Sequence, residues 1–217
     1  MKVMTYNIRH GQGGDGWVSN DRIARVVRDA SADIVGLNEV WRLGPFFDQP
    51  AYLRERLSME SAFERNTGRG FYEQGNLVLT THRIIRVENI ALPSQVEQRG
   101  CLLVHIEIDA EEVAFGAVHL SLGRTARAAQ LAALAEKLPR DMPLVLAGDM
   151  NCPVGELEPL TELLTLADAP PSYPAFWPRR ALDHIGFSKH WNLVQVSAVN
   201  SRASDHRPVI AQLKRAR

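Results

Sequence analysis

Acidic, amide and imidazole side chains stand at the ends of several short apolar runs in this chain of 217 residues. These residues are Asn7, Glu39, His119, Asp149 and the adjacent pair of Asp205 and His206. Carboxylate and amide oxygens are the ligands that Mg²⁺ prefers, and a carboxylate beside an imidazole orients the ring and raises its basicity. The combination suits phosphate-ester hydrolysis, in which a metal polarises the phosphoryl oxygen, a carboxylate prepares the water, and an imidazole meets the developing charge.

The amide and the carboxylate nearest the N-terminus suggest a divalent cation. Asn7 could also cap a turn, and the carboxylate of Glu39 could be neutralised by Arg42 instead of a metal ion. Asn7, Glu39 and Asp205 together supply oxygen ligands of the kind that Mg²⁺ binds. Zinc fits less well, because the chain has neither an HExxH motif nor a cluster of Cys and His ligands.

Two further motifs supply groups that can move protons. In the segment GDMN, Asp149 and Asn151 are spaced so that both side chains can face one ligand, although a turn with Asx capping uses the same residue types. In SDHRPV, Asp205 precedes His206, and the alternative to catalysis is a structural histidine held by a neighbouring acid. Each motif alone fits a structural role as well, and only their combination with the oxygen ligands favours a catalytic role.

The composition limits the partners and the compartment. The apolar fraction is 45% and the charged fraction 23%, as in ordinary globular domains, and 25 basic residues balance 25 acidic ones. Strong duplex binding depends on Lys and Arg that neutralise phosphates, so a small substrate or nucleic acid held with modest affinity fits better. Two cysteines, no signal-peptide-like start and no apolar segment of membrane length predict a cytoplasmic protein, which we expect to be monomeric.

Short alternating apolar runs predict many strands and few helices. Strands are expected at 2–8, 33–40, 76–80, 84–92, 101–109, 113–120, 144–148, 182–187 and 209–213, with a weaker candidate at 193–199. Helices are expected at 21–30, 50–57, 124–138 and 155–164. Helices that fall between strands predict an α/β fold of one domain, residues 1–217, in which two sheets pack face to face under helices. The polar residues at the strand ends are expected to meet at one edge.

Seven segments follow the order of one known family, and they are MTYNI, LNEV, YEQGNLVLT, VHL, GDMN, LDHI and SDHRPV, from Met4 to Val209. On these segments the chain resembles the endonuclease/exonuclease/phosphatase superfamily, which includes deoxyribonuclease I, AP endonucleases and sphingomyelinases. The resemblance implies two packed mixed β-sheets flanked by helices, the four-layer α/β sandwich of deoxyribonuclease I, with Mg²⁺ or Mn²⁺ as the cofactor. Asn38 stands where the family more often has Gln, and the chain is shorter than most members.

The resemblance also implies roles for individual residues. Asn7 and Glu39 would hold the metal near the scissile phosphate. Asp149 would orient or deprotonate the attacking water, and Asn151 would hydrogen-bond the phosphate. Arg99 precedes a predicted strand, where some nucleases of the family have a phosphate-binding Arg.

The resemblance also implies an acidic partner for each active-site histidine. His206, polarised by Asp205 or Asp183, would stabilise charge on the phosphoryl oxygens. His119 resembles the family's other active-site histidine, and Glu73 in YEQGN is placed like its acidic partner. Asp183 in LDHI matches a further acid, either beside the metal or behind a histidine.

Within this class we favour a phosphodiesterase, either a nuclease of modest DNA affinity or an enzyme acting on a small or lipid phosphodiester. A phosphomonoesterase is the alternative, and a non-catalytic binding module of the same fold is a third interpretation. Alternation along its strand predicts that His184 faces away from Asp183. Trp177 lies in a proline-rich loop and could meet a base or a lipid headgroup, although packing is the simpler interpretation.

Overall fold

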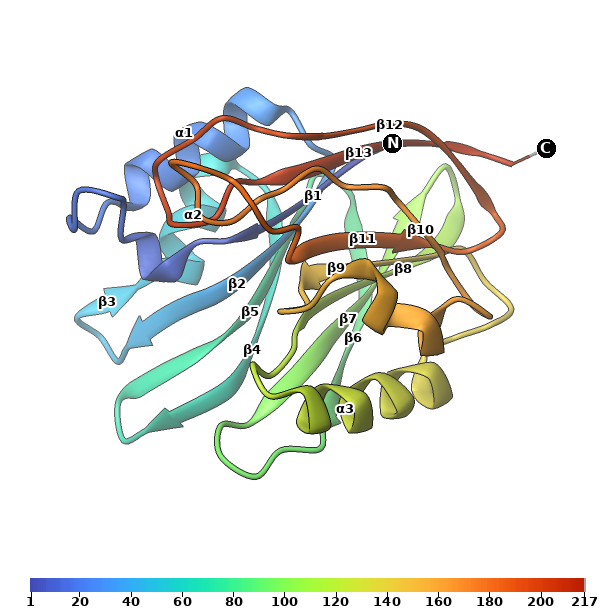
Figure 1. Ribbon diagram of the computed structural model, residues 1–217. Coiled ribbons are helices and arrows are strands. Elements are labelled where there is room, and N and C mark those ends of the chain that lie inside the picture. The colour runs from blue at the N-terminus through green and yellow to red at the C-terminus, as the bar shows by residue number, and fades with distance from the viewer. Residues whose placement is uncertain (217) are drawn as a thin grey trace.

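Two β-sheets packed face to face form the centre of the protein in the computed structural model, which describes residues 1–216 (Figure 1). The first sheet has seven strands, of which β1 and β2 run parallel and the other neighbours antiparallel. In sheet order the strands are β12 (Trp191–Ala198), β13 (Val209–Arg215), β1 (Lys2–Asn7), β2 (Ile34–Leu43), β5 (Tyr72–Thr80) and β4 (Glu60–Arg69), with β3 (Phe47–Asp48) paired to β2.

The second sheet has six strands and one parallel pair, β8 with β9. In sheet order the strands are β10 (Thr165–Leu166), β11 (Asp183–Phe187), β9 (Leu144–Asp149), β8 (Glu111–His119), β7 (Arg99–Ile108) and β6 (Arg83–Leu92). Both sheets are therefore mixed, as the family resemblance implies.

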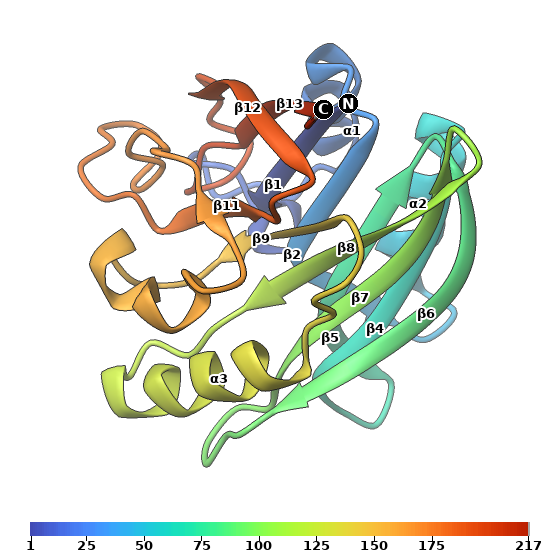
Figure 2. The same ribbon diagram turned by 90° about the vertical axis from the view of Figure 1, so that its right-hand side faces the viewer.

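Helices cover the outer face of each sheet, which completes the four layers (Figure 2). Ile23 and Leu53 from two helices pack on the first sheet, and Leu134 and Leu157 pack on the second. The first pair of helices is α1 (Asn20–Ala30) and α2 (Gln49–Leu57), and the second is α3 (Arg124–Lys137) with the 3₁₀ helix η2 (Val154–Leu160); a 3₁₀ turn, η1 (Arg9–Gly11), follows β1. This arrangement confirms the predicted sandwich.

The two-residue strands β3 and β10 and the turn η1 were not predicted, and two longer elements also differ from the sequence prediction. The helix expected at 155–164 is the shorter 3₁₀ segment η2, because Pro159 inside it lacks an N–H and its ring obstructs a regular α-helix. β4 was not predicted at all. It lies at the edge of the first sheet, and its sequence ESAFERNTGR is polar and mostly half-buried or exposed, so it lacks the apolar alternation of an interior strand.

The two cysteines are free and buried in the layer between α3 and the second sheet. Burial raises the pKa of the Cys101 thiol to about 12 and that of the Cys152 thiol to about 11. Over residues 1–216, no helix combines the length and the apolar character that crossing a bilayer requires.

Candidate functional site

Strand alternation brings four of the predicted residues, Asn7, His119, Asp149 and Asp183, to one edge between the sheets. The core residues on the same strands that face the opposite sheet are Val3, Ala117, Ala147 and Ile185, each an even number of positions from its polar counterpart. Strand register then sets the neighbours, since Asp149 lies directly beside Asp183 on one adjoining strand and beside His119 on the other. The interior face of the sandwich therefore ends in a row of one amide and three titratable side chains.

Glu39 reaches this edge through a β-bulge. Regular alternation would turn Glu39 towards the helices together with Leu37, which packs in that layer. The pairing of β2 with β5 instead shifts register between Leu37 and Val40, and Glu39 has a φ of +56°. A bulge of this kind re-aims a side chain. It brings the carboxylate within hydrogen-bonding distance of Asn7.

The Asn7 side chain links carboxylates from the two sheets. Its Nδ2 donates to Glu39 Oε1 and to Asp149 Oδ2, both at 3.0 Å. Its Oδ1 accepts the backbone N–H of Arg9 at 3.0 Å, and the Ser204 hydroxyl donates to the backbone carbonyl oxygen of Asn7 at 2.8 Å. The amide nitrogen, and not the oxygen, faces the two carboxylates, so in this arrangement Asn7 positions acids.

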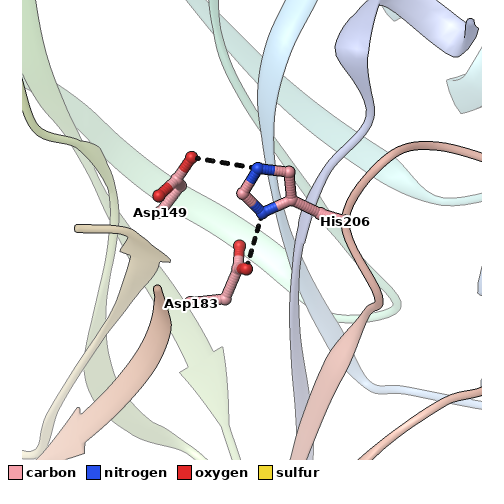
Figure 3. Close-up of side chains that lie close together, drawn as sticks. All are labelled: Asp149, Asp183 and His206. Carbon is pink, nitrogen blue, oxygen red and sulfur yellow. Dashed lines mark hydrogen bonds and ion pairs between the residues drawn. The ribbon is translucent and has the colours of Figure 1, made fainter. Parts of the chain in front are cut away.

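His206 lies between two buried aspartates (Figure 3). Its Nδ1 is 2.8 Å from Asp183 Oδ2, and its Nε2 is 3.7 Å from Asp149 Oδ2. The Ser172 hydroxyl donates to the same oxygen of Asp183 at 2.5 Å. Burial alone would lower the pKa of His206, but the charge and hydrogen bond of Asp183, with the charge of Asp149, raise it to about 9. The ring is therefore a cation at neutral pH.

Asp149 is the carboxylate on which the site converges, and it is only 2% exposed. Besides Asn7, its Oδ2 is approached by Nε2 of His119 at 3.6 Å and Nε2 of His206 at 3.7 Å, while its Oδ1 accepts the backbone N–H of Asn151 at 3.0 Å. Burial, followed by the charge of the neighbouring aspartate, raises the pKa of Asp149 to about 7. The imidazole separations are long for direct hydrogen bonds and suit an intervening oxygen atom.

His119 is neutral, in contrast to the cationic His206. Its Nδ1 lies 3.0 Å from Nη1 of Arg99, and a guanidinium can only donate, so Nδ1 accepts and the ring proton is on Nε2. Burial, followed by the charge of Arg99, lowers the pKa of His119 well below its usual value. Arg99 is 8% exposed, and Glu97 accepts from its guanidinium at 2.8 Å.

Three predicted residues lie around this cluster or away from it. Asn151 donates its side-chain N–H to a loop carbonyl, that of Leu120, at 2.9 Å. Asp205 is half-buried on the rim, where it lies 3.5 Å from Arg9. Glu73 does not reach His119.

The position of Glu73 follows from strand pairing. Residues 42 and 73 are cross-strand partners, and the carboxylate of Glu73 lies 3.0 Å from Nη1 of Arg42 and 3.8 Å from Nη1 of Arg65. The side chain beside His119 Nδ1 is Arg99, so a cation stands where the family resemblance led us to expect an acid.

Two buried amides, Asn38 and Asn76, lie beneath the site. The sequence analysis noted Asn38 only as a departure from the family pattern, and it missed Asn76. Asn38 Oδ1 accepts the backbone N–H of Asp149 at 3.0 Å, and its Nδ2 donates to Val118 O and to Asn76 Oδ1. Asn76 Nδ2 donates in turn to carbonyls of β7 and β8. Both amides stand inside apolar runs, and a buried amide requires partners, so this signal was present in the sequence. His184 faces the outer layer as predicted, with Nε2 2.8 Å from Cys152 O.

The donor chemistry of the cluster suits a hard cation. Asp149, Asp183 and His206 offer ligand atoms within 4.8 Å of one another, which makes them a possible metal site. Asp183 Oδ1 is buried and has no hydrogen-bond partner among residues 1–216. Both nitrogens of a cationic His206 carry protons, so the atoms free to bind a metal are carboxylate oxygens, including those of Glu39. Oxygen donors are the preference of Mg²⁺.

Comparisons with known proteins agree with this geometry. The uncharacterized protein YbhP of Escherichia coli (strain K12) is 29% identical over 250 residues, which covers 98% of this chain and 95% of YbhP. The structure of an endonuclease/exonuclease/phosphatase from Beutenbergia cavernae has a TM-score of 0.86 at 25% identity, over 100% of this chain and 72% of that one. A mannosyl-6-phosphatase from Bacteroides thetaiotaomicron has a TM-score of 0.81 at 20% identity, over 99% of each chain.

The family model described as the Endonuclease/Exonuclease/phosphatase family matches residues 4–206. This segment begins just before Asn7, ends at His206, and contains the whole cluster on the interior edge of the two sheets. The chain therefore belongs to the endonuclease/exonuclease/phosphatase family.

Proposed function

We propose that the chain is a metal-dependent phosphoesterase that acts on phosphodiesters. The observation that carries this proposal is the convergence on Asp149 Oδ2 of an amide and two imidazoles, one neutral and one cationic. A carboxylate with a pKa of about 7 can accept a proton from water near neutral pH. Fixed N–H donors can stabilise the charge that develops on phosphoryl oxygens. These are the two functions that hydrolysis of a phosphate ester requires.

Each group has one task in the proposed mechanism. Asp149 takes the proton of the attacking water, and Asn7 and the backbone N–H of Asn151 hold its carboxylate in place. His206, as a cation, and His119, as a neutral donor, meet the negative charge on the phosphoryl oxygens.

Glu39 and Asp205 are the proposed ligands for Mg²⁺ or Mn²⁺. Their side chains are 24% and 31% exposed, so their oxygens are accessible at the rim, and Asn7 orients Glu39. When bound, such an ion polarises a phosphoryl oxygen as a Lewis acid. Of the three metal ligands predicted from the sequence, Glu39 and Asp205 remain proposed ligands, whereas Asn7 is proposed to position Glu39.

The charge of the site favours a diester over a monoester. Four carboxylates, those of Glu39, Asp149, Asp183 and Asp205, belong to the cluster or its rim, and a single cationic imidazole lies among them. A phosphodiester carries one negative charge, whereas a monoester at neutral pH carries more and is repelled more strongly. Monoester hydrolysis is the second candidate, because the mannosyl-6-phosphatase from Bacteroides thetaiotaomicron shares the fold.

A substrate panel tests the proposal. With Mg²⁺ or Mn²⁺ present, we expect release of p-nitrophenol from bis-p-nitrophenyl phosphate and little from p-nitrophenyl phosphate. Chelation with EDTA should abolish the activity, and either metal should restore it. Asp149→Ala and His206→Ala should each lower kcat by about 10²–10⁴-fold, the usual effect of removing such groups. Plasmid DNA, sphingomyelin and inositol phosphates extend the panel to larger and lipid substrates.

Thermal melting of the same variants separates catalysis from folding. Asp168→Ala is the matched control, since this residue is an aspartate outside the cluster. Hydrolysis of the mono ester alone would select the second candidate. Activity that survives exhaustive chelation would exclude the metal, and inactivity on every substrate would favour a binding module of the same fold.

A further inference from the structure

A pocket of about 620 Å³ adjoins the catalytic cluster. Ser204 and Asp205, which precede His206 in the chain, form one wall. Tyr173 forms another, and the centroids of the Tyr173 and His206 rings lie 4.8 Å apart. The volume lies within the range of roughly 300–1,000 Å³ found for small-ligand sites. One ligand molecule could therefore place a phosphate at His206 and another of its groups in this pocket.

Backbone hydrogen bonds between loops hold the walls of the pocket together. The N–H of Gly14 donates to the carbonyl of Arg202 at 3.1 Å, and the N–H of Ala175 donates to the carbonyl of Asp205 at 2.7 Å. Three segments far apart in the sequence are thus connected around one space. These hydrogen bonds fix the loops relative to one another, and a fixed binding site lowers the entropic cost of binding.

The lining carries an excess of positive charge. Three guanidinium groups face two carboxylates there. Arg22 Nη1 lies 2.6 Å from Asp15, and Arg9 lies 3.5 Å from Asp205. Arg202 is exposed and makes no ion pair within residues 1–216. Its fork of donors is therefore available for an anion, and a guanidinium matches the geometry of a phosphate.

The remaining wall is apolar, and its aromatic part is exposed. Pro174, Ala175 and Phe176 line the pocket, and Phe176 is 69% exposed. Trp177 follows, 62% exposed, with the Arg179 guanidinium 5.5 Å from its ring. Exposed aromatic rings next to a cationic site suit a ligand that has both a flat or apolar part and an anionic part.

We infer that this pocket holds the non-reacting part of the substrate and that Arg202 binds a second phosphate group on it. The inference rests on the phosphodiesterase function proposed above, and it narrows the substrate class to phosphodiesters that carry a further phosphate beside an apolar or ring-containing group. Arg202 is a specificity residue in this account, because the reacting phosphate contacts the cluster around Asp149.

Paired thymidine compounds test this inference by binding and by turnover. Calorimetry in EDTA compares thymidine 3′,5′-bisphosphate with thymidine 5′-monophosphate. Kinetics with Mg²⁺ compare the 5′-(p-nitrophenyl phosphate) of thymidine with and without a 3′-phosphate. We expect the wild type to favour the compound with the additional phosphate by about tenfold or more in each pair, the usual effect of a hydrogen bond to a charged group.

Variants identify the residue responsible. Arg202→Ala should reduce both ratios to near one, and Arg202→Lys should retain part of the preference because the charge remains without the fork. Arg25→Ala is the matched control, an exposed arginine on α1 that does not line the pocket, and both ratios should stay at the wild-type value.

The two arms distinguish the failure of the pocket from the failure of the proposed function. A wild-type binding ratio near one, or a ratio that Arg202→Ala leaves unchanged, overturns the inference even if every ester is hydrolysed. A tenfold binding preference that depends on Arg202, with no p-nitrophenol released from any ester, supports the pocket and overturns the phosphodiesterase function.

Discussion

A cationic and a neutral histidine lie against the same carboxylate oxygen of Asp149. The difference comes from the partner of Nδ1 in each ring. Asp183 accepts from His206 and stabilises a cation, whereas Arg99 donates to His119 and keeps that ring neutral. One ring can thus supply charge and the other a hydrogen bond without charge, at the same distance from the proposed base.

The rate should depend on pH in a bell shape. Asp149 must lose its proton to act as a base, so kcat/KM should rise through a pH of about 7. His206 must keep its proton, so kcat/KM should fall again as the pH passes about 9. Asp183→Asn removes the charge that raises the pKa of His206 and should move the alkaline limb to lower pH. A steady-state profile between pH 5 and 10 measures both limbs.

The same pKa shift predicts a stability change. Because the folded-state pKa of His206 lies above its unfolded value of 6.5, its contribution to stability is complete below pH 6.5 and disappears as the pH rises through about 9. The melting temperature of the wild type should fall over that window by more than that of His206→Asn. In the rate profile, an alkaline limb of kcat/KM that stays at the same pH in Asp183→Asn would show that a group other than His206 controls it.

At the scale of elements, most of the fold and several site residues were predicted from the apolar runs of the strands and from the polar residues at their ends. Asn7, His119 and Asp149 were predicted from the sequence because each stands at the end of an apolar run, and in the structure each continues the inward-facing series of its strand. Asp183 was predicted only through the family resemblance of the segment LDHI. The α/β sandwich followed from the same runs. Local sequence is sufficient here, since the geometry repeats every second residue.

The rest depended on contacts between elements. The carboxylate of Glu39 faces the site only because a bulge interrupts β2, and no residue pattern indicates that bulge. The partner of His119 was assigned to Glu73 by resemblance, but cross-strand pairing gives Glu73 to Arg42, and Arg99 takes the place beside the ring. Tertiary packing, and not local sequence, decides whether an acid or an arginine lies beside the His119 ring.

The buried amides join the two sheets below the site, which makes a prediction at this scale. Asn76 connects β5 to β7 and β8, and through Asn38 it supports the backbone of Asp149. Asn76→Leu leaves buried carbonyls without donors, so the free energy of unfolding in urea should fall by about 2 kcal/mol or more. Asn192→Leu, at an exposed position on β12, should change it by less than about 0.5 kcal/mol. Equal losses in the two variants would contradict the bridging role.

At the scale of the whole molecule, the site draws on both ends of the chain. Asn7 and His206 come from positions near the two termini, yet both lie within 4 Å of Asp149. The site therefore exists only when the two sheets are packed together. That residues 1–217 form one domain stays a prediction, and this dependence is a reason to expect cooperative unfolding.

Carboxylates gathered from two sheets repel one another, so a cation should stabilise the folded chain. We expect Mg²⁺ at saturating concentration to raise the melting temperature by about 5 °C or more relative to EDTA, as for a ligand that binds only the folded state. Glu39→Gln should remove most of this increase, whereas Glu158→Gln, at an exposed position, should leave it intact. Scanning calorimetry measures the shift, and an increase that persists in Glu39→Gln would assign the cation to other ligands.

The burial of both cysteine thiols has a practical consequence. Thiolates are the nucleophiles that attack alkylating reagents, and neither Cys101 nor Cys152 forms a thiolate near neutral pH or contacts solvent in the folded chain. A cysteine introduced in place of Phe176 would then be the one site that maleimide dyes modify in the native protein. A fluorophore attached there would report directly on ligand entry, with no need to remove either natural cysteine.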